Sequence, residues 1–297
     1  QAIHLRENKI SVFRFGMDFT ADYYDFFHRS AESGRSNKMA DGKISGFLAH
    51  DKNQKVIMLS IVIPTLNEEN YLSLLLESIK RQHFDFEDYE IIVSDAGSED
   101  KTKEIAKKYN CQIVNGGFPA FGKNRGAEAA GGELILFVDA DVILEDNSLE
   151  KFLSEFKNKN LAVATFLLKS PKKFHHISFK LLYNLPSNLT EKFLPQAMNT
   201  ILVKKDIHQK IKGFDEGVKI GEELDYVRRA KKFGKFGVLK SSKIIASPRR
   251  FQQDGWLTTW LKYFLCQIYM LFFGPVKSDI LKYRFNHYSK RIKNQLK

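Results

Sequence analysis

The chain has 297 residues, of which 43% are hydrophobic and 28% charged. This composition is typical of a globular protein and excludes a disordered, collagen-like or multi-span membrane protein. The formal net charge is +12, and the two cysteines, Cys111 and Cys266, are too few for a disulfide framework, so we expect a reducing compartment.

The positive charge is concentrated in the last quarter of the chain. From Arg228 to Lys297 there are 17 Lys and Arg residues against two acids, whereas the preceding residues carry a small acidic excess. Such a segment attracts polyanions, which include nucleic acids, diphosphates and anionic membrane surfaces.

Residues 1–57 precede the first clear strand pattern. Gln1–Lys9 is polar and no apolar stretch follows it, so we expect no signal peptide. Thr20 could cap a short helix over residues 21–33. We expect residues 1–57 to be either an extension packed on the main domain or a gene-start artefact, because Met58 directly precedes that strand.

Strand and helix patterns alternate from residue 59 onward. Short apolar runs predict strands at residues 59–63, 90–94, 111–114 and 133–138, and amphipathic or small-residue patterns predict helices at 68–82, 100–109, 121–131 and 146–157. Such alternation predicts an α/β fold with a mostly parallel, Rossmann-like sheet flanked by helices. Ligands of such sheets bind at the carboxyl ends of the strands.

Polar residues follow three of these predicted strands. Asp139 and Asp141 form a D-x-D motif, and their oxygens suit Mg²⁺ or Mn²⁺, although Asp-x-Asp is also a common turn tripeptide. Asp95 could hold the base or ribose of a nucleotide, or belong to a turn whose Ser98 caps the next helix. Glu68 could likewise act on a ligand or only favour the start of a helix.

A glycine-flanked segment, Gly122–Gly126, opens a predicted helix. Its backbone N–H groups, together with Lys123 and Arg125, could meet a diphosphate. The segment fits neither of the common glycine-rich phosphate motifs, so by itself it is weak evidence.

In their order and spacing, five stretches resemble the family 2 glycosyltransferases of the GT-A fold. The resemblance covers about residues 58–250, which we expect to be the catalytic domain. The matching stretches are Ile61–Glu69, Val93–Thr102, Gly122–Gly126, Phe137–Asp141, and Gly213–Asp215 followed by Gly221–Asp225.

The resemblance implies a role for each matching position. Glu68 and Asp95 would hold the base and ribose of a nucleotide-sugar, Asp139 would approach the ribose and the metal, and Asp141 would ligate the metal on the diphosphate. The remaining positions implied in nucleotide-sugar binding are Pro64, Thr65, Asn67 and Lys123.

The same resemblance implies Glu223 as the general base. This chain departs from the family there, because Asp is usual at that position, so Glu222 and Asp225 stay open as alternatives. Lys123 stands where the family often has Arg, which keeps the charge and loses the planar fork. These three acids could also be no more than a solvated helix start. One base opposite the leaving group predicts direct displacement, hence an inverting reaction.

The last part of the chain carries two features. At the end of the domain, Arg249 and Arg250 could close over the diphosphate or be a surface pair. Residues 251–297 form a basic, aromatic-rich tail. Residues 256–273 contain 14 apolar residues, with Thr258, Thr259, Lys262 and Gln267 as the exceptions. They predict an amphipathic helix that either lies in a membrane interface or packs on the sheet, and residues 277–297 predict a cationic amphipathic end.

The sequence therefore predicts a metal-dependent inverting transferase that moves a sugar from a nucleotide-sugar to a glycan or lipid-linked acceptor. We expect single transfer, no nucleic-acid partner, and a place at the cytoplasmic face of the membrane, in cell-envelope or lipid-linked glycan synthesis. The alternatives are a non-catalytic membrane- or polyanion-binding protein on a degenerate scaffold and a sugar-nucleotide pyrophosphorylase. The pyrophosphorylase would need a Gly-rich, Arg-containing loop after the first strand, and residues 64–67 do not form one.

Overall fold

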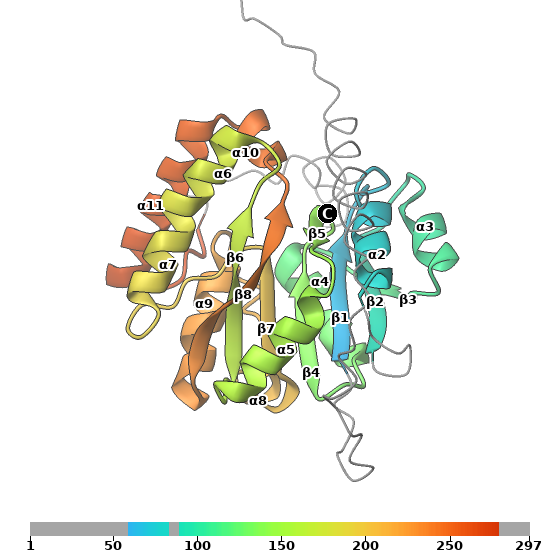
Figure 1. The fold of residues 1–297 in the computed structure, drawn as a ribbon, viewed down its shortest axis with the longest axis horizontal. Coiled ribbons are helices and arrows are strands. Elements are labelled where there is room, and N and C mark those ends of the chain that lie inside the picture. The colour runs from blue at the N-terminus through green and yellow to red at the C-terminus, as the bar shows by residue number, and fades with distance from the viewer. Residues whose placement is uncertain (1–58, 83–88, 279–297) are drawn as a thin grey trace, which may run out of the picture. The chain divides into compact units, whose positions relative to one another are not determined.

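Figure 1 shows the fold in a computed structural model, which describes residues 59–82 and 89–278. These residues form one eight-stranded sheet flanked by helices. Its strands are β1 (Leu59–Thr65), β2 (Tyr89–Asp95), β3 (Gln112–Asn115), β4 (Leu134–Val138), β5 (Val142–Leu144), β6 (Val163–Lys169), β7 (Thr200–Lys204) and β8 (Phe236–Ala246). The predicted N-terminal helix at residues 21–33 and the cationic residues 279–297 lie outside the described residues.

The strand order is β3-β2-β1-β4-β7-β6-β8-β5. The four strands from β3 to β4 are parallel to one another. β7 runs antiparallel between β4 and β6, β8 is parallel to β6, and β5 is antiparallel to β8. The prediction of a mostly parallel α/β sheet is confirmed.

Helices follow most of the strands. They are α2 (Leu72–Lys80), α3 (Thr102–Lys108), α4 (Pro119–Ala129), α5 (Ser148–Asn158), α6 (Lys173–Phe179), α7 (Leu185–Thr190), α8 (Lys205–Lys210), α9 (Glu222–Ala230), α10 (Arg249–Gln253) and α11 (Trp256–Phe272), with a π-helical turn η2 (Lys180–Asn184) and a 3₁₀ turn η3 (Lys231–Phe233). Within the described ranges, no helix is long and apolar enough to cross a membrane.

Two apolar layers enclose the sheet, because successive side chains of a strand point to opposite faces. Ile61 and Ile63 of β1 belong to the cluster that contains residues of α2 and α5. Val62 belongs to the opposite cluster, with residues of α4 and α9. α4 comes very close to β1, since a Cβ built on Gly126 would lie 2.2 Å from Val62 Cγ1. This packing holds the sheet in place, and the ends of its strands β1, β2 and β4 carry Glu68, Asp95 and Asp139.

Some element boundaries differ from the predicted ones. The helix predicted at residues 68–82 begins at Leu72, because Asn67 has a left-handed φ of 55° and a turn follows it. The helix predicted at 146–157 begins at Ser148, directly after Asn147, which also has a φ of 55°. In the first place Tyr71 and Leu72 donate backbone hydrogen bonds to the Glu68 carbonyl, so a turn precedes the helix, and in the second Ser148 donates to the Glu145 carbonyl.

Candidate functional site

Charged side chains from distant parts of the sequence meet at the carboxyl end of the parallel strands. Glu68 follows β1, and Asp139 and Asp141 follow the neighbouring strand β4. β2 and β3 lie on the other side of β1, so the strand order reverses between β1 and β4. Such a reversal opens a crevice between the two loops, where open α/β sheets bind their ligands.

Arg249, at the start of α10, joins the two sides of this crevice. Its Nη1 and Nη2 donate hydrogen bonds of 2.7 and 2.6 Å to the two carboxylate oxygens of Glu68. Its Nε lies 2.9 Å from Asp141 Oδ2, and its guanidinium stands 4.8 Å from the centroid of the Tyr71 ring. Burial alone would lower the pKa of Arg249, but the charges of Asp141 and Glu68 outweigh it and raise that pKa.

Lys123 of α4 forms a second centre of charge and is only 1% exposed. Its Nζ donates a hydrogen bond to Glu223 and lies 3.7 Å from Glu222 Oε1 and 3.9 Å from Asp139 Oδ1. Burial alone would lower its pKa, but the three carboxylates raise it. Lys123 is therefore a buried cation that holds the start of α9 beside the D-x-D motif.

The carboxylates around Lys123 differ in their proton affinities. Burial, reinforced by the charge of Glu223, raises the pKa of Glu222 to about 7. Burial would also raise the pKa of Glu223, but the charge and hydrogen bond of Lys123 lower it below its usual value. Glu223 is thus ionised at neutral pH, and its neighbour exchanges a proton near neutrality. Two adjacent acids with separated pKa values are a common basis for proton transfer.

Arg250 belongs to the same network. Burial alone would lower its pKa, but the neighbouring Tyr263, Asp141 and Asp139 raise it. Burial raises the pKa of Tyr263 to about 12, so the Tyr263 phenol stays protonated there. Both arginines of the predicted pair therefore lie against the acidic residues of the crevice.

The side chains of Asp95 and Asn67 are engaged in holding loops. Asp95 accepts hydrogen bonds from the backbone of Gly97 (3.0 Å) and Ser98 (2.8 Å), and also from the hydroxyls of Thr65 and Ser98. Asn67 Oδ1 accepts a hydrogen bond from the backbone N–H of Glu99. The idea that Ser98 caps the next helix is wrong, because α3 begins at Thr102 and has no side-chain cap. Ser98 instead accepts a hydrogen bond from the Asn67 backbone.

Two further predicted residues have clear positions. Pro64, the penultimate residue of β1, lies against α4. A Cβ built on Gly122 of α4 would be 3.5 Å from the Cβ of Pro64. Asp225 accepts a 2.7 Å hydrogen bond from Arg229 Nε, and Arg229 also donates to two backbone carbonyls. The Asp225 carboxylate thus secures α9 to the preceding loop, whereas Glu222 and Glu223 face Lys123.

Sequence reasoning did not identify three side chains of this region. Asn199, which has a left-handed φ of 62°, donates a 3.2 Å hydrogen bond from Nδ2 to Asp139 Oδ2. Tyr71 lies under Arg249, and Tyr263 lies beside Arg250. None of them belongs to a motif, and only the left-handed preference of Asn is a signal that sequence could have offered at position 199.

Asp139 and Asp141 present hard carboxylate oxygens to the crevice. In the part of the chain that the structure describes, no three His, Cys, Asp or Glu side chains are grouped to hold a metal by themselves. A pair of carboxylates still fits Mg²⁺ or Mn²⁺, because these ions take much of their coordination from substrate phosphates and water. Asp141 already faces the positive charge of Arg249 at 2.9 Å, which supports the view that its carboxylate can face a metal cation.

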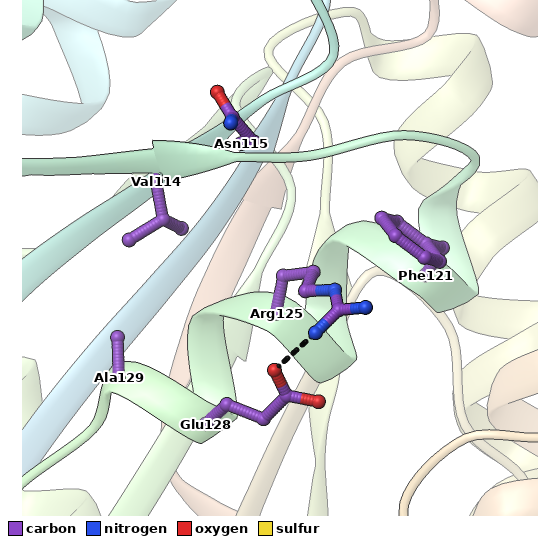
Figure 2. Close-up of a pocket in the computed structure, with 6 residues that line it drawn as sticks. All are labelled: Val114, Asn115, Phe121, Arg125, Glu128 and Ala129. Carbon is purple, nitrogen blue, oxygen red and sulfur yellow. Dashed lines mark hydrogen bonds and ion pairs between the residues drawn. The ribbon is translucent and has the colours of Figure 1, made fainter.

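A shallow pocket of about 590 Å³ lies apart from these acids. Figure 2 shows that it lies between β3 and α4 and that Arg125 in its wall pairs with Glu128. The two side chains approach to 2.6 Å. The lining of the pocket also includes Val114, Asn115, Phe121 and Ala129. Arg125, which the sequence suggested could meet a diphosphate, instead pairs here with Glu128 and stands over the Phe121 ring.

Comparison with known proteins identifies the family. Residues 60–213, which are more than half of the chain, match the model of "Glycosyl transferase family 2". This chain belongs to that family. The resemblance inferred from the five motifs is confirmed.

Individual relatives agree with this assignment. The chain is 31% identical over 216 residues to the minor teichoic acid biosynthesis protein GgaB of Bacillus subtilis, covering 66% of this chain and 23% of the relative. It is 30% identical over 161 residues to the GalNAc(5)-diNAcBac-PP-undecaprenol beta-1,3-glucosyltransferase of Campylobacter jejuni, covering 50% and 46%. The chain thus spans less than half of the length of these relatives.

A solved structure establishes the fold class. The mannosyltransferase PcManGT from Pyrobaculum calidifontis, in complex with GDP-Man and Mn²⁺, superposes with a TM-score of 0.60 over 85% of this chain and 72% of its own. The sequence identity is 16%, so the likeness concerns the fold. The predicted GT-A fold is confirmed.

Proposed function

We propose that this member of glycosyl transferase family 2 is an inverting glycosyltransferase that moves a sugar from a nucleotide-sugar to an acceptor hydroxyl. One observation carries the proposal. The acids Asp139, Glu222 and Glu223 converge on the buried Lys123, and Asp141 pairs with the half-buried Arg249, at the carboxyl edge of the sheet. A purely structural role would not require so many charges at a ligand-binding edge, because buried charges are costly to desolvate.

The donor would bind across the crevice between β1 and β4. Glu68, Asp95 and the residues Pro64, Thr65 and Asn67 would form the side that holds the nucleoside. Asp139 and Asp141 would hold Mn²⁺ or Mg²⁺, which when bound would neutralise charge on the leaving diphosphate. Arg249 would leave Glu68 and Asp141 as the donor enters.

The cations would stabilise the departing diphosphate. Lys123, Arg249 and Arg250 would lie around the diphosphate, where negative charge would grow as the bond from the anomeric carbon to the diphosphate oxygen breaks. Preorganised charges of this kind lower the barrier because they need not reorient during the reaction.

The proton of the acceptor hydroxyl would pass to Glu223. Its pKa is held below the usual value, so it is ionised and able to accept a proton, and Lys123 fixes its carboxylate. The hydroxyl oxygen then bonds to the anomeric carbon from the side opposite the leaving diphosphate, which inverts that carbon. Glu222 is the second candidate, because its pKa of about 7 also suits proton transfer.

The acceptor would be a glycan of the cell envelope or a lipid-linked glycan. Support comes from the names of two relatives, one a minor teichoic acid biosynthesis protein and the other a glucosyltransferase for a PP-undecaprenol-linked glycan. Such an acceptor would place the reaction at a membrane surface.

The test is release of nucleoside diphosphate from a panel of UDP-, GDP- and dTDP-sugars, with Mn²⁺ and with EDTA. We expect metal-dependent release from one donor, and its loss in Asp141→Ala. Pyrophosphate-dependent formation of a nucleoside triphosphate would instead indicate a pyrophosphorylase. Nucleotide binding without turnover, with or without a glycan acceptor, would indicate a non-catalytic scaffold.

Three matched variants assign the base. We expect Glu223→Gln to reduce kcat by about 10²- to 10⁴-fold, the usual contribution of a general base. Asp225→Asn should reduce stability more than kcat, because Asp225 pairs with Arg229. A larger loss of kcat in Glu222→Gln than in Glu223→Gln would transfer the role to Glu222.

A further inference from the structure

α11 presents an apolar face to solvent. Five large side chains along it are between 38% and 70% exposed: Leu257, Leu261, Phe264, Ile268 and Leu271. Their spacing of three or four residues places them on one side of the helix. A surface helix of a globular protein normally turns such a face to the core.

A second apolar face runs through α6, η2 and α7. Five side chains at the same helical spacing are between 47% and 68% exposed: Phe174, Ile177, Leu181, Leu185 and Leu189. Phe193, in the turn after α7, is 72% exposed. This segment lies beside α11, as Figure 1 shows and as the ring contacts of Phe174 with Trp256 and of Phe179 with Trp260 require. We call these two exposed faces together the helical docking face.

Part of the polar stripe of α11 faces the protein, although Thr258 is exposed. Thr259 and Cys266 are 2% and 1% exposed, and Gln267 pairs with Gln196 and accepts a 2.7 Å hydrogen bond from Arg228. Of the two alternatives expected from the sequence, packing on the domain is observed for this side of the helix, and contact with a membrane stays a prediction. Thr259, Cys266 and Met270 are buried, Trp256, Trp260 and Tyr263 pack partly against the core, and the apolar side chains named above stay outside.

The charges around the helical docking face are positive. Residues 171–194 contain four lysines and one acid. Residues 254–278 contain Lys262 and Lys277 against Asp254, and Lys277 pairs with Asp215 at 2.7 Å, so the excess comes from residues 171–194. The one acid of residues 171–194, Glu191, turns toward β8, where it accepts a hydrogen bond from the Val238 backbone and pairs with Lys240. The sequence beyond α11 continues this excess, with six Lys and Arg against one acid in residues 279–297.

We propose that the helical docking face binds the surface of an anionic lipid bilayer. Exposed apolar side chains accompanied by lysines match the boundary between acyl chains and anionic headgroups. Contiguous apolar surface of this kind marks an interaction site on a soluble protein. This goes beyond the proposed sugar transfer and does not depend on the identity of the donor.

Docking would bring the candidate site to the membrane. α10 carries Arg249 and Arg250 and directly precedes α11. Phe251 of α10 packs on Trp260, with ring centroids 5.1 Å apart, and Tyr263 of α11 lies beside Arg250. The bilayer-bound helix would therefore hold the arginines of the crevice close to the headgroups, where a lipid-linked acceptor is available.

Flotation of the full chain with vesicles, without nucleotide, tests the proposal. We expect binding to vesicles of phosphatidylcholine and phosphatidylglycerol, weaker binding to phosphatidylcholine alone, and weakening at high salt. The double variants Leu261→Gln/Phe264→Gln and Leu185→Gln/Leu189→Gln should each lose about tenfold or more in vesicle affinity. Phe118→Gln, which removes an exposed aromatic side chain from the β3–α4 loop, should bind as the wild type does.

A second measurement does not depend on disruptive variants. With brominated lipids, the tryptophan fluorescence of Leu261→Trp should be quenched more than that of the wild type. The fluorescence of Phe118→Trp should gain no quenching over the wild type. Equal vesicle binding by all variants, or no quenching at position 261, would overturn the proposal. Dimers that dissociate in the same double variants, without vesicle binding, would assign the face to a second copy of the chain.

The two proposals can fail separately. Vesicle binding without turnover of any donor would leave the docking proposal standing and reject the proposed transfer. Donor turnover without vesicle binding would support the proposed transfer and reject the docking proposal.

Discussion

Lys123 offers the sharpest test of the charge network. Lys123→Met keeps much of the side-chain volume and removes the cation that faces Glu223, Glu222 and Asp139. Because Lys123 is 1% exposed, water cannot replace its charge. Removing one partner of a buried ion pair costs about 3–5 kcal/mol. In a domain of this size, each kcal/mol lowers Tm by about 2–4 °C, so Tm should fall by about 6–20 °C.

Thermal and urea unfolding would measure this loss, and two further variants act as controls. Lys123→Arg keeps the charge and should retain more stability than Lys123→Met. The double variant Lys123→Met/Glu223→Gln removes a carboxylate together with its cation, and we expect it to recover about 1–3 kcal/mol relative to the single variant.

The pH dependence of the loss has a defined sign. Without Lys123, burial raises the pKa values of the facing carboxyls, and their protonated forms fold at a lower cost. The deficit of Lys123→Met should therefore be largest above about pH 7 and shrink as the pH falls. A Tm within about 2 °C of wild type, or a double variant no more stable than Lys123→Met, would refute the view that Lys123 neutralises this cluster.

Three other predictions concern separate parts of the domain. Arg249→Gln frees Asp141 from a competing cation, so Mn²⁺ should bind about tenfold more tightly without nucleotide in calorimetric titration; unchanged or weaker binding would argue against competition. Burial and a nearby arginine lower the pKa of His208 to about 4. Its neutral form thus contributes stability that is lost as the pH falls from about 6.5 toward 4, about 2 kcal/mol by pH 5, and His208→Asn should flatten that loss in urea titrations. Gly126→Ala should destabilise by about 1–3 kcal/mol despite the better helix propensity of Ala, because the new methyl overlaps Val62, and trimming that side chain to Ala should restore part of the stability.

The sequence by itself determined the layered fold and the ends of the strands that carry the acids. The apolar runs at residues 59–63, 90–94 and 133–138 became the strands β1, β2 and β4, because a strand buried on both faces requires an unbroken apolar run. Parallel strands bring their carboxyl ends to one edge, so Glu68 and Asp141 could be expected on the same side of the sheet. Order and spacing of the motifs were enough to identify the family.

Only the tertiary structure decided which of these charges meet. Arg249 reaches Glu68 across 181 positions of sequence, and Lys123 reaches Glu223 across 100. The tertiary structure also turned Asp225 toward Arg229 and placed Thr259 and Cys266 of α11 against the protein. Local patterns fix the faces of an element, whereas the partners of a face depend on how helices far apart in the chain pack together. That packing buried Lys123 among three acids and left the apolar side of α11 exposed.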